Sequence, residues 1–409
     1  MERINRSQYT ERILSLLGKG EVIVLTGHRR AGKSCILECL ADMLHNKGHV
    51  LYLDMENPDF TDINDYERLN SWIKKHVSEK KHNYLLIDEI QEIAAFEKTL
   101  RYWVKQPDMD IVVTGSNAKM LSSEIATVFA GRYLRVHVQS LNYREYLAFH
   151  RMTPSPEALS SYLRWGGLPF LCNIPASDVR TRTDYLGSIY DTIFVKDIIH
   201  RKQVRNVAFI DNLARFVADN SGKLFSASSI AKYMKKEDVS VSSNTVADYM
   251  ETLCSTYMID RVQRYDIRGK RIFEQQEKYY FEDLGIRNYL CRDKRQTDLE
   301  KILENAVYIK LINEGYTVYV GQLDGKEIDF VAQRGDETSY YQVSMQISSP
   351  DTYEREFGNL KRIKDNHPKY VVTMDSMATL LNDDGIQVLK AEDFLLLVSD
   401  KISKKATAR

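Results

Sequence analysis

Short apolar runs alternate with longer amphipathic stretches through the first third of the chain. The apolar runs lie at residues 21–26, 49–54, 83–88, 110–115 and 133–138. Helical periodicity covers residues 8–18, 33–47, 63–79 and 92–105. Short apolar strands separated by helices predict a mostly parallel sheet with helices on both faces. We therefore expect residues 1–140 to form an α/β domain.

The pattern changes three times after residue 140. Residues 141–205 read as a helical segment interrupted at 165–169, and residues 206–295 as two short helices followed by basic strands. Residues 296–400 predict a separate small α/β unit, and a basic tail covers residues 401–409. Within the small unit we expect a helix over 298–314, strands over 317–321, 327–332 and 340–345, a helix near 352–364 and a strand over 370–374.

Composition narrows the functional classes. Lys and Arg together number 57, as do Asp and Glu, so the formal net charge is zero. A net charge of zero argues against nucleic-acid binding through the overall charge of the protein, but it allows a local basic patch. The apolar runs are far shorter than a membrane span, and Met1 is followed by a polar stretch rather than a signal-peptide core. We expect a cytoplasmic protein with reduced cysteines and no membrane partner.

A glycine-rich loop follows the first apolar run. It reads Gly-His-Arg-Arg-Ala-Gly-Lys-Ser over residues 27–34, between a strand and the start of a helix. Glycines let successive N–H groups curl around a phosphate, and the new helix directs its N-terminus at the same place. Lys33 would reach the β- and γ-phosphates, and the hydroxyl of Ser34 would bind Mg²⁺. The predicted ATP-binding residues are Gly27, His28, Arg29, Arg30, Ala31, Gly32, Lys33, Ser34 and Cys35.

Two further strands end in polar residues. The run at 84–87 is followed by Asp88 and Glu89, where Asp88 would hold Mg²⁺ and Glu89 would orient and deprotonate the attacking water. The run at 111–113 is followed by Thr-Gly-Ser-Asn at 114–117. If this strand lies between the other two, Ser116 or Asn117 would face the γ-phosphate; the alternative is that they cap the next helix.

These motifs resemble the AAA-type branch of P-loop ATPases. With residues 129–133, 141–147 and the Gly-Gly-Leu-Pro sequence at 166–169, nearly the whole chain resembles a large bacterial and archaeal family. Its members join an AAA-type ATPase to a C-terminal domain. The resemblance offers Arg132 as an arginine finger acting on a neighbouring subunit, which implies a homo-oligomer. The alternative for Arg132 is an ion pair that ties its strand to a helix.

The middle of the chain has a winged helix-turn-helix pattern. Two helices, near 226–234 and 242–257, precede a β-ribbon at 261–271. Ser243, Asn244 and Thr245 would meet base edges at the first helical turn. The basic side chains of the ribbon would contact duplex DNA phosphates; they are Arg261, Arg264, Arg268, Lys270 and Arg271. The second helix carries Asp248 and Glu251 but no Lys or Arg, so the alternative is a winged helix used for protein contact or domain packing.

The last third resembles the PD-(D/E)-x-K nuclease superfamily. Glu304 on a helix and Asp329 on a strand match its two metal-binding carboxylates. The Glu-x-Lys position holds Gln342-Val343-Ser344, which loses a negative charge and the lysine that positions the hydroxide. The site is either degenerate or served by another lysine such as Lys326. An active nuclease is the minority alternative.

The sequence as a whole predicts Mg²⁺-dependent ATP binding and hydrolysis that moves the C-terminal domains. The expected cofactors are ATP and Mg²⁺. Two tasks remain open for this movement: action linked to duplex DNA, and an ATP-gated protein-interaction switch with a degenerate nuclease domain.

Overall fold

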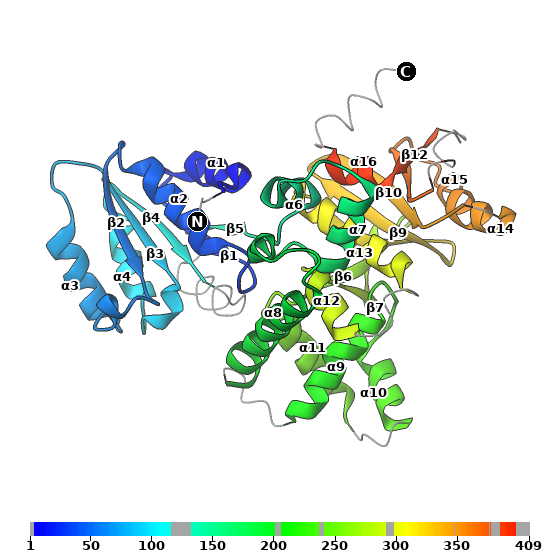
Figure 1. Ribbon diagram of the computed structural model, residues 1–409, viewed down its shortest axis with the longest axis horizontal. Coiled ribbons are helices and arrows are strands. Elements are labelled where there is room, and N and C mark those ends of the chain that lie inside the picture. Colours follow the sequence, from blue (N-terminus) through cyan, green and yellow to red (C-terminus); the bar gives the residue numbers. More distant parts are fainter. Residues whose placement is uncertain are drawn as a thin grey trace. The chain divides into compact units, whose positions relative to one another are not determined.

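The chain divides into two compact units. The computed structural model describes residues 4–115, 132–200, 206–236, 241–291, 298–347, 349–375, 377 and 385–397. The first unit comprises residues 1–139 with the short segment 255–257, and the second comprises residues 140–254 and 258–409. In Figure 1 the blue and cyan elements belong to the first unit, and the yellow to red elements belong to the second.

The first unit contains a five-stranded, all-parallel sheet. Its strands are β1 (Val22–Thr26), β2 (His49–Asp54), β3 (Asn83–Asp88), β4 (Met109–Thr114) and β5 (Tyr133–His137). Their order across the sheet is β2-β3-β4-β1-β5. Strand β4 therefore lies between β3 and β1, which is the condition on which the interpretation of residues 111–117 depends.

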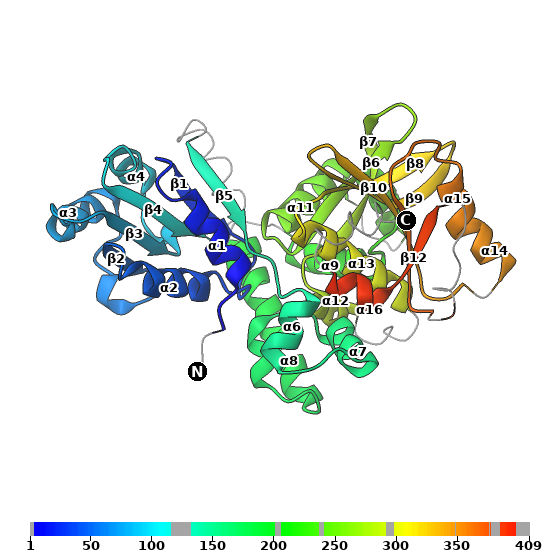
Figure 2. The ribbon, with the colours of Figure 1, turned by 90° about the horizontal axis from the view of Figure 1, so that it is seen from above.

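Helices cover both faces of this sheet. Helices α1 (Ser7–Leu16) and α2 (Lys33–Leu44) pack on one face, and α3 (Tyr66–His76) and α4 (Glu97–Trp103) on the other (Figure 2). Alternate side chains of β1 face the two layers: Ile23 and Leu25 meet α1 and α2, whereas Val22 and Val24 meet α3 and α4. A strand buried on both faces reads as a continuous apolar run. The predicted α/β fold with a parallel, doubly covered sheet is confirmed.

The second unit contains a seven-stranded mixed sheet. Its strands are β6 (Ile259–Asp266), β7 (Arg271–Phe281), β8 (Thr317–Leu323), β9 (Lys326–Arg334), β10 (Glu337–Ser344), β11 (Lys369–Thr373) and β12 (Ile386–Lys390). The order is β12-β11-β10-β9-β8-β6-β7. Strands β6 and β8 pair in parallel. The hairpin β6–β7 is thus the edge of this sheet, which runs across the predicted domain boundary at 295–296.

Two apolar layers enclose the second sheet. Helices α13 (Leu299–Asn313) and α16 (Ala391–Leu396) bury one face, in contact with alternate residues of β8 to β11. The other face packs against η6 (Glu354–Gly358) and α15 (Asn359–Lys361), which follow α14 (Pro350–Tyr353). The helix predicted over 352–364 is therefore three short consecutive segments, although its apolar residues do face the sheet.

The remaining helices of the second unit are α6 (Tyr143–His150), α7 (Pro156–Trp165), η4 (Pro169–Asn173), α8 (Val179–Thr192), η5 (Ile193–His200), α9 (Val207–Asp219), α10 (Ala227–Lys236), α11 (Ser243–Ser255) and α12 (Leu284–Cys291). They divide between two cores: α6 and α7 join the core of α13 and α16, and the others pack beside β7. Tyr279 and Phe281 of β7 join the apolar core that α8 to α12 build. Phe225 forms an isolated antiparallel bridge with Glu277 of β7, so the helices and the hairpin are one packed body.

The Gly-Gly-Leu-Pro sequence has a packing role. Gly166 has φ of 74°, and a Cβ on Gly167 would lie 2.2 Å from the carbonyl oxygen of Leu141. The buried carboxylate of Asp283 accepts the N–H of Gly167 at 2.8 Å. No larger side chain fits at Gly167 without moving backbone. This motif therefore joins α7 to the turn that precedes α12.

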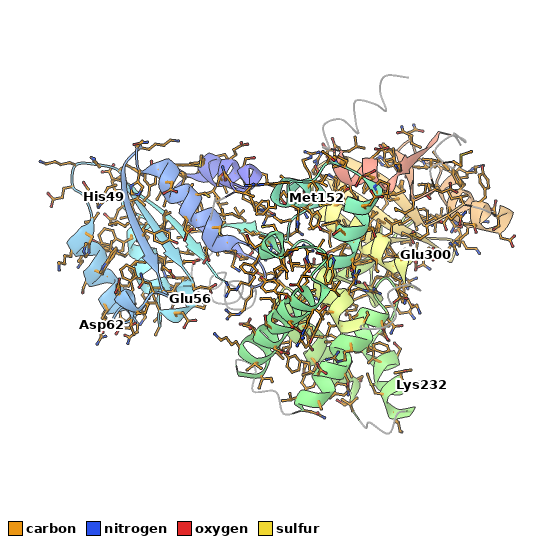
Figure 3. The ribbon with its side chains drawn as sticks, viewed as in Figure 1. His49, Glu56, Asp62, Met152, Lys232 and Glu300 are labelled. Atoms are coloured by element: carbon orange, nitrogen blue, oxygen red, sulfur yellow. The ribbon has the colours of Figure 1, made fainter. Side chains whose placement is uncertain are left out.

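Exposed charged side chains occur in both units. Asp62, Lys232 and Glu300 are examples, labelled in Figure 3. Among the residues that the structure describes, no helix combines the length and the apolarity that a membrane span requires.

Candidate functional site

The loop between β1 and α2 has the backbone of a phosphate cradle. Gly27 has φ of 139° and Gly32 has φ of 100°, and Arg30 between them is also left-handed at 64°. A Cβ on Gly27 would lie 2.1 Å from the carbonyl oxygen of Val138, so only glycine allows the loop to leave β1 here. Helix α2 begins at Lys33 and directs its N-terminal N–H groups into the loop.

Lys33 is held over this loop. Its side chain is buried, and Nζ donates to the carbonyl oxygens of Gly27 at 2.9 Å and His28 at 3.0 Å. Burial, together with the charge of Lys33, lowers the pKa of His28 to about 3. The neutral imidazole donates from Nδ1 to the carbonyl oxygen of Arg29 at 2.5 Å. Lys33 therefore carries the positive charge of the inner loop.

Arg6 braces the loop from the N-terminal segment. Its guanidinium is buried and donates from one nitrogen to the carbonyl oxygens of Ala31 at 3.0 Å and Gln139 at 2.7 Å. A charged donor that satisfies two backbone carbonyls fixes the loop relative to the end of β5. Sequence reasoning missed this residue, because nothing in residues 4–6 marks it.

The second half of the site lies at the carboxyl ends of the neighbouring strands. Asp88 ends β3 and is buried, and its carboxylate accepts hydrogen bonds from Thr114 of β4 and from Ser34 of α2. Burial raises the pKa of Asp88, and the hydroxyls of Thr114 and Ser34 oppose that rise. The predicted metal ligands Ser34 and Asp88 are thus in direct contact, and Thr114 is an unpredicted third member.

Glu89 lies just beyond the strand in a strained conformation. Its φ of 51° and ψ of 52° are left-handed, and its N–H donates to Thr114 Oγ1 at 2.9 Å. The amide nitrogen of Gln91 donates to the carboxylate of Glu89. Glu89 is only partly buried, so its carboxylate remains accessible at the edge of the sheet that carries the loop.

The other residues predicted for this site have varied positions. Arg29 is half-buried, whereas Arg30 and Cys35 are exposed. Ser116 and Asn117 lie outside the described residues. Arg132 is exposed and precedes β5, and its carbonyl oxygen accepts the N–H of Val22. Because β1 and β5 are parallel, Arg132 lies at the edge opposite the loop and does not reach the loop of its own chain.

The first turn of α11 is exposed. Ser243 and Asn244 are exposed and Thr245 is half-buried. Ser242 caps the helix, since its hydroxyl accepts the N–H of Thr245 at 3.1 Å. Two of the three helix residues predicted to meet base edges are thus available at a helix N-terminus.

The arginines of the β6–β7 hairpin are engaged within the chain. Arg268 pairs with Asp324 at 2.8 Å, and Arg271 with Asp266 at 3.5 Å. Arg261 lies 3.9 Å from Glu251 and 3.8 Å from Glu277, while Arg264 donates to Gln276 and Gln322. Lys270 sits in the turn of the hairpin with φ of 48°. The local acidic residues therefore offset much of the basic charge predicted from the ribbon.

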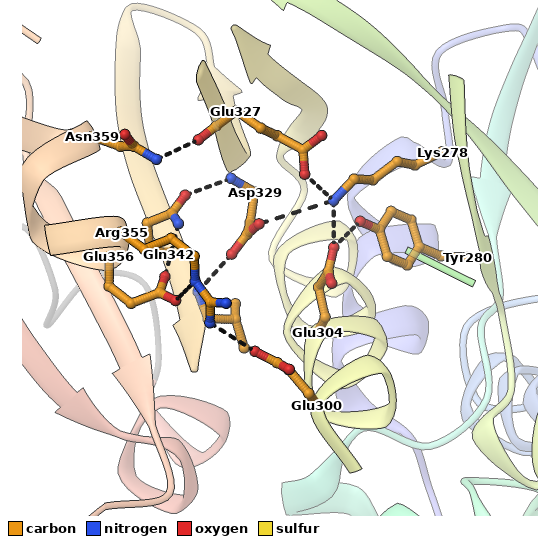
Figure 4. A network of polar contacts seen from close by, with 11 residues as sticks. Lys278, Tyr280, Glu300, Glu304, Glu327, Asp329, Gln342, Arg355, Glu356 and Asn359 are labelled. Atoms are coloured by element: carbon orange, nitrogen blue, oxygen red, sulfur yellow. Dashed lines mark hydrogen bonds and ion pairs between the residues drawn. The ribbon is translucent and has the colours of Figure 1, made fainter. Parts of the chain in front are cut away.

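A second polar site lies in the second unit and is drawn in Figure 4. Glu304 of α13 and Glu327 and Asp329 of β9 direct their carboxylates at one point, and the ammonium group of Lys278 from β7 occupies it. We call these four residues the carboxylate cluster. The predicted Glu304 and Asp329 do come together, with Gln342 beside them, as its oxygen accepts the N–H of Asp329 at 2.8 Å.

The lysine of this cluster is not the one considered from the sequence. Lys326 is exposed, and Ser344 at the expected lysine position donates its hydroxyl to the carbonyl oxygen of Gln346 at 3.2 Å. Lys278 comes from a strand outside the predicted nuclease-like unit. The available signal was a charged residue beside Tyr279-Tyr280-Phe281, a run that predicts a buried strand.

Known proteins resemble this chain in sequence. An AAA domain family model matches residues 19–147, and a model of a domain of unknown function matches residues 156–297. An uncharacterized protein of Haemophilus influenzae is 33% identical over 402 residues, which cover 96% of this chain and 98% of that protein. The uncharacterized protein MJ1544 of Methanocaldococcus jannaschii is 25% identical over 394 residues, covering 91% of this chain and 85% of that protein.

A solved structure that shares this fold is a known ATPase. The Walker-type ATPase of Pyrococcus abyssi aligns with a TM-score of 0.50 and 14% identity, covering 70% of this chain and 95% of that one. Together with the AAA domain match, this likeness identifies the first unit as a P-loop ATPase fold.

Proposed function

The chain belongs to the same protein family as the Haemophilus influenzae protein, and from this premise we propose that it is a Mg²⁺-dependent ATPase. One observation carries the proposal. Lys33 and Ser34 after β1, Thr114 at the end of β4, and Asp88 with Glu89 after β3 meet at one edge of the parallel sheet. Ligands of open α/β sheets bind at this edge.

The donors at this edge fit a nucleotide with Mg²⁺. Ser34 and Asp88 supply the hydroxyl and carboxylate oxygens that a hard cation prefers, and they already contact each other. The ammonium group of Lys33 rests on two loop carbonyls, where phosphate oxygens can replace them as acceptors. Bound Mg²⁺ would neutralise the charge that develops on the transferred phosphoryl group.

The residues of the chain then divide the work of hydrolysis. The loop and Lys33 hold the β- and γ-phosphates, and Glu89 orients a water molecule and accepts its proton as the water oxygen bonds to the γ-phosphorus. The bond from this phosphorus to the β–γ bridging oxygen breaks, leaving ADP and inorganic phosphate. The contact with Gln91 holds the carboxylate of Glu89 in place.

Arg132 completes this proposal only in an oligomer. Because it is exposed at the edge of the sheet opposite the loop, its side chain cannot contact a nucleotide bound in its own chain, but it can contact one bound in a neighbouring copy. An arginine supplied in trans is worth about 10³–10⁵ in rate. We therefore propose that ATP turnover depends on assembly of at least two copies.

The decisive experiment compares two neighbouring glutamates. Glu89→Gln removes the proposed base, whereas Glu92→Gln makes the same change at an exposed residue. We expect Glu89→Gln to retain ATP without turnover and Glu92→Gln to hydrolyse it normally; Lys33→Ala should not bind ATP. Equal turnover in the two glutamine variants would show that Glu89 is not the base.

The task served by hydrolysis has two candidates. The exposed first turn of α11, with Ser243 and Asn244, supports a link to duplex DNA. The paired arginines of the hairpin support a protein partner instead, because phosphates would have to displace acidic groups that already bind them. We propose the DNA-linked ATPase first and the protein-interaction switch as its alternative. Fluorescence anisotropy with duplex DNA, at low and moderate salt, separates them: steeply salt-dependent binding is expected only of the first.

A further inference from the structure

The ammonium group of Lys278 lies at the centre of the carboxylate cluster. Its Nζ is 2.8 Å from Glu304 Oε1, 2.8 Å from Glu327 Oε1 and 3.9 Å from Asp329 Oδ1, and the side chain is 2% exposed. A divalent cation bound by these carboxylates would need oxygens at about 2.0–2.6 Å. Such an ion and the ammonium group would compete for the same space between the same oxygens (Figure 4).

The oxygens around this point are largely committed to other donors. Glu304 Oε1 also accepts the hydroxyl of Tyr280 at 2.6 Å, and Asp329 Oδ2 accepts the N–H of Val343 at 2.8 Å. The other oxygen of Glu304 packs on Gly222, where a Cβ would lie only 2.9 Å away. Few lone pairs are therefore left to coordinate a metal ion.

Gln342 is bound in a way that does not offer a metal ligand. Its oxygen accepts the N–H of Asp329 at 2.8 Å, and its amide nitrogen donates to Glu356 Oε2 at 2.8 Å. Arg355 pairs with Glu356 at 2.8 Å, so this outer carboxylate has its own cation. The neutral amide also lowers the negative charge of the site relative to a carboxylate at the same position.

The charge balance of the cluster agrees with this geometry. Burial alone would lower the pKa of Lys278, but Glu304, Asp329 and Glu327 outweigh it and raise that pKa. Burial, and then the charge of Glu304, raise the pKa of Asp329, while Lys278 opposes the rise. Lys278 therefore stays charged, and its positive charge partly opposes the effect of burial on the pKa of Asp329.

We propose that the ammonium group of Lys278 is the built-in cation of the carboxylate cluster, in the position that a divalent metal ion would need. The cluster is then a metal-independent lock that fastens β7 to α13 and to β9. The second unit acts as a rigid binding element and does not cleave phosphodiester bonds at this site. This inference is independent of ATP hydrolysis in the first unit.

The test asks whether removing the lysine creates a metal site. The background is the chain of residues 1–409 carrying Asp88→Asn, which removes the proposed metal ligand of the nucleotide site. This protein is titrated with Mn²⁺ in the absence of nucleotide, and the concentration of free Mn²⁺ is measured by electron paramagnetic resonance. We expect no binding at millimolar Mn²⁺ in this background. Adding Lys278→Met should create a Mn²⁺ site, and adding Asp329→Asn to that variant should abolish it. Lys326→Met, at an exposed lysine, is the matched control and should gain nothing.

Stability gives an independent readout. Breaking a buried ion pair by removing one partner should lower the melting temperature of Lys278→Met by on the order of 10 °C, and Mn²⁺ should restore part of the loss. If this variant does not fold, the melting temperature of Lys278→Met/Glu304→Gln, which removes one charge of each sign, is compared with that of Glu304→Gln. Three results would overturn the proposal: Mn²⁺ binding to the intact cluster that Asp329→Asn removes, Mg²⁺-dependent DNA nicking with the same sensitivity, or a folded Lys278→Met protein that gains no Mn²⁺.

Discussion

Thr114 offers the sharpest test of the nucleotide site, because its hydroxyl links both acidic residues. It donates to the carboxylate of Asp88 and accepts the N–H of Glu89 at 2.9 Å, and the residue is fully buried. Thr114→Val keeps the shape of the side chain and removes only these two hydrogen bonds. The Asp88 carboxylate loses a donor, and the N–H that fixes Glu89 in its left-handed conformation is left without an acceptor.

The magnitude follows from these two losses. A hydrogen bond to a charged group contributes about 1.5–3 kcal/mol, and an unsatisfied buried donor costs about 1–3 kcal/mol. If the bond to Asp88 is needed to hold Mg²⁺ in the transition state, kcat/KM should fall about 10- to 100-fold. The half-saturating Mg²⁺ concentration should rise. Because the hydroxyl opposes the effect of burial on the pKa of Asp88, its loss should also shift the acidic limb of the rate profile to higher pH.

A matched control separates chemistry from stability. Thr99 is also buried, and its hydroxyl donates to the carbonyl oxygen of Tyr66 at 2.7 Å, remote from the loop. Thr99→Val should cost about 1 kcal/mol of unfolding free energy and leave ATP turnover unchanged. Turnover and denaturant unfolding are measured on both variants. If Thr114→Val hydrolyses ATP as well as Thr99→Val, at the same Mg²⁺ dependence, Thr114 has no part in the site.

Three further results are expected. As the pH falls from 6.5 to about 3, the free energy of unfolding of the wild-type protein should decrease by up to about 1.4 kcal/mol per pH unit, because His28 is protonated in the unfolded chain but resists protonation in the folded one. His28→Gln should remove this component, whereas His45→Gln, at an exposed residue, should not. Urea unfolding at several pH values measures both. Arg132→Ala and Lys33→Ala proteins, each inactive alone, should regain ATP turnover when mixed; no recovery would argue against action in trans. Gly167→Ala should destabilise the second unit by about 3 kcal/mol through its clash with backbone, read by thermal unfolding, and an unchanged melting temperature would contradict the packing role.

The fold of the first unit could be predicted closely because its central strands, β1, β3 and β4, are buried on both faces and have continuous apolar runs. The bounds of β2 and β3 agree with those expected from the apolar runs, although β2 is a partly buried edge strand. Helix ends were less predictable. Helix α3 begins only after Asp65, whose carboxylate accepts the N–H groups of Glu67 and Arg68, and α4 begins at Glu97 because Ala95 has φ of 54°. Periodicity alone does not register such local hydrogen bonds.

Much of the nucleotide site of the first unit could be predicted from the sequence because its residues lie close together along the chain. Lys33 and Ser34 are adjacent and follow the loop after β1, and Asp88 and Glu89 are adjacent where β3 ends. Only the sheet order then has to bring them together, and parallel pairing ensures that strand ends meet at one edge. The sequence predicts no role for Thr114, because a threonine that ends a buried strand is not distinctive in sequence.

The carboxylate cluster shows the opposite case. Its cation and its anions come from β7, α13 and β9, elements that no single motif spans, and pairing of β6 with β8 is what brings the hairpin onto the sheet. A comparison with the nuclease motif shows only that Gln342 and Ser344 replace the expected glutamate and lysine, since it tests for named residues at fixed positions. The absence of the expected residues at these two positions does not show whether the metal site is weakened or whether another cation occupies it. That depends on where Lys278 lies, and its position follows from the long-range pairing of strands, which neither propensity nor spacing predicts.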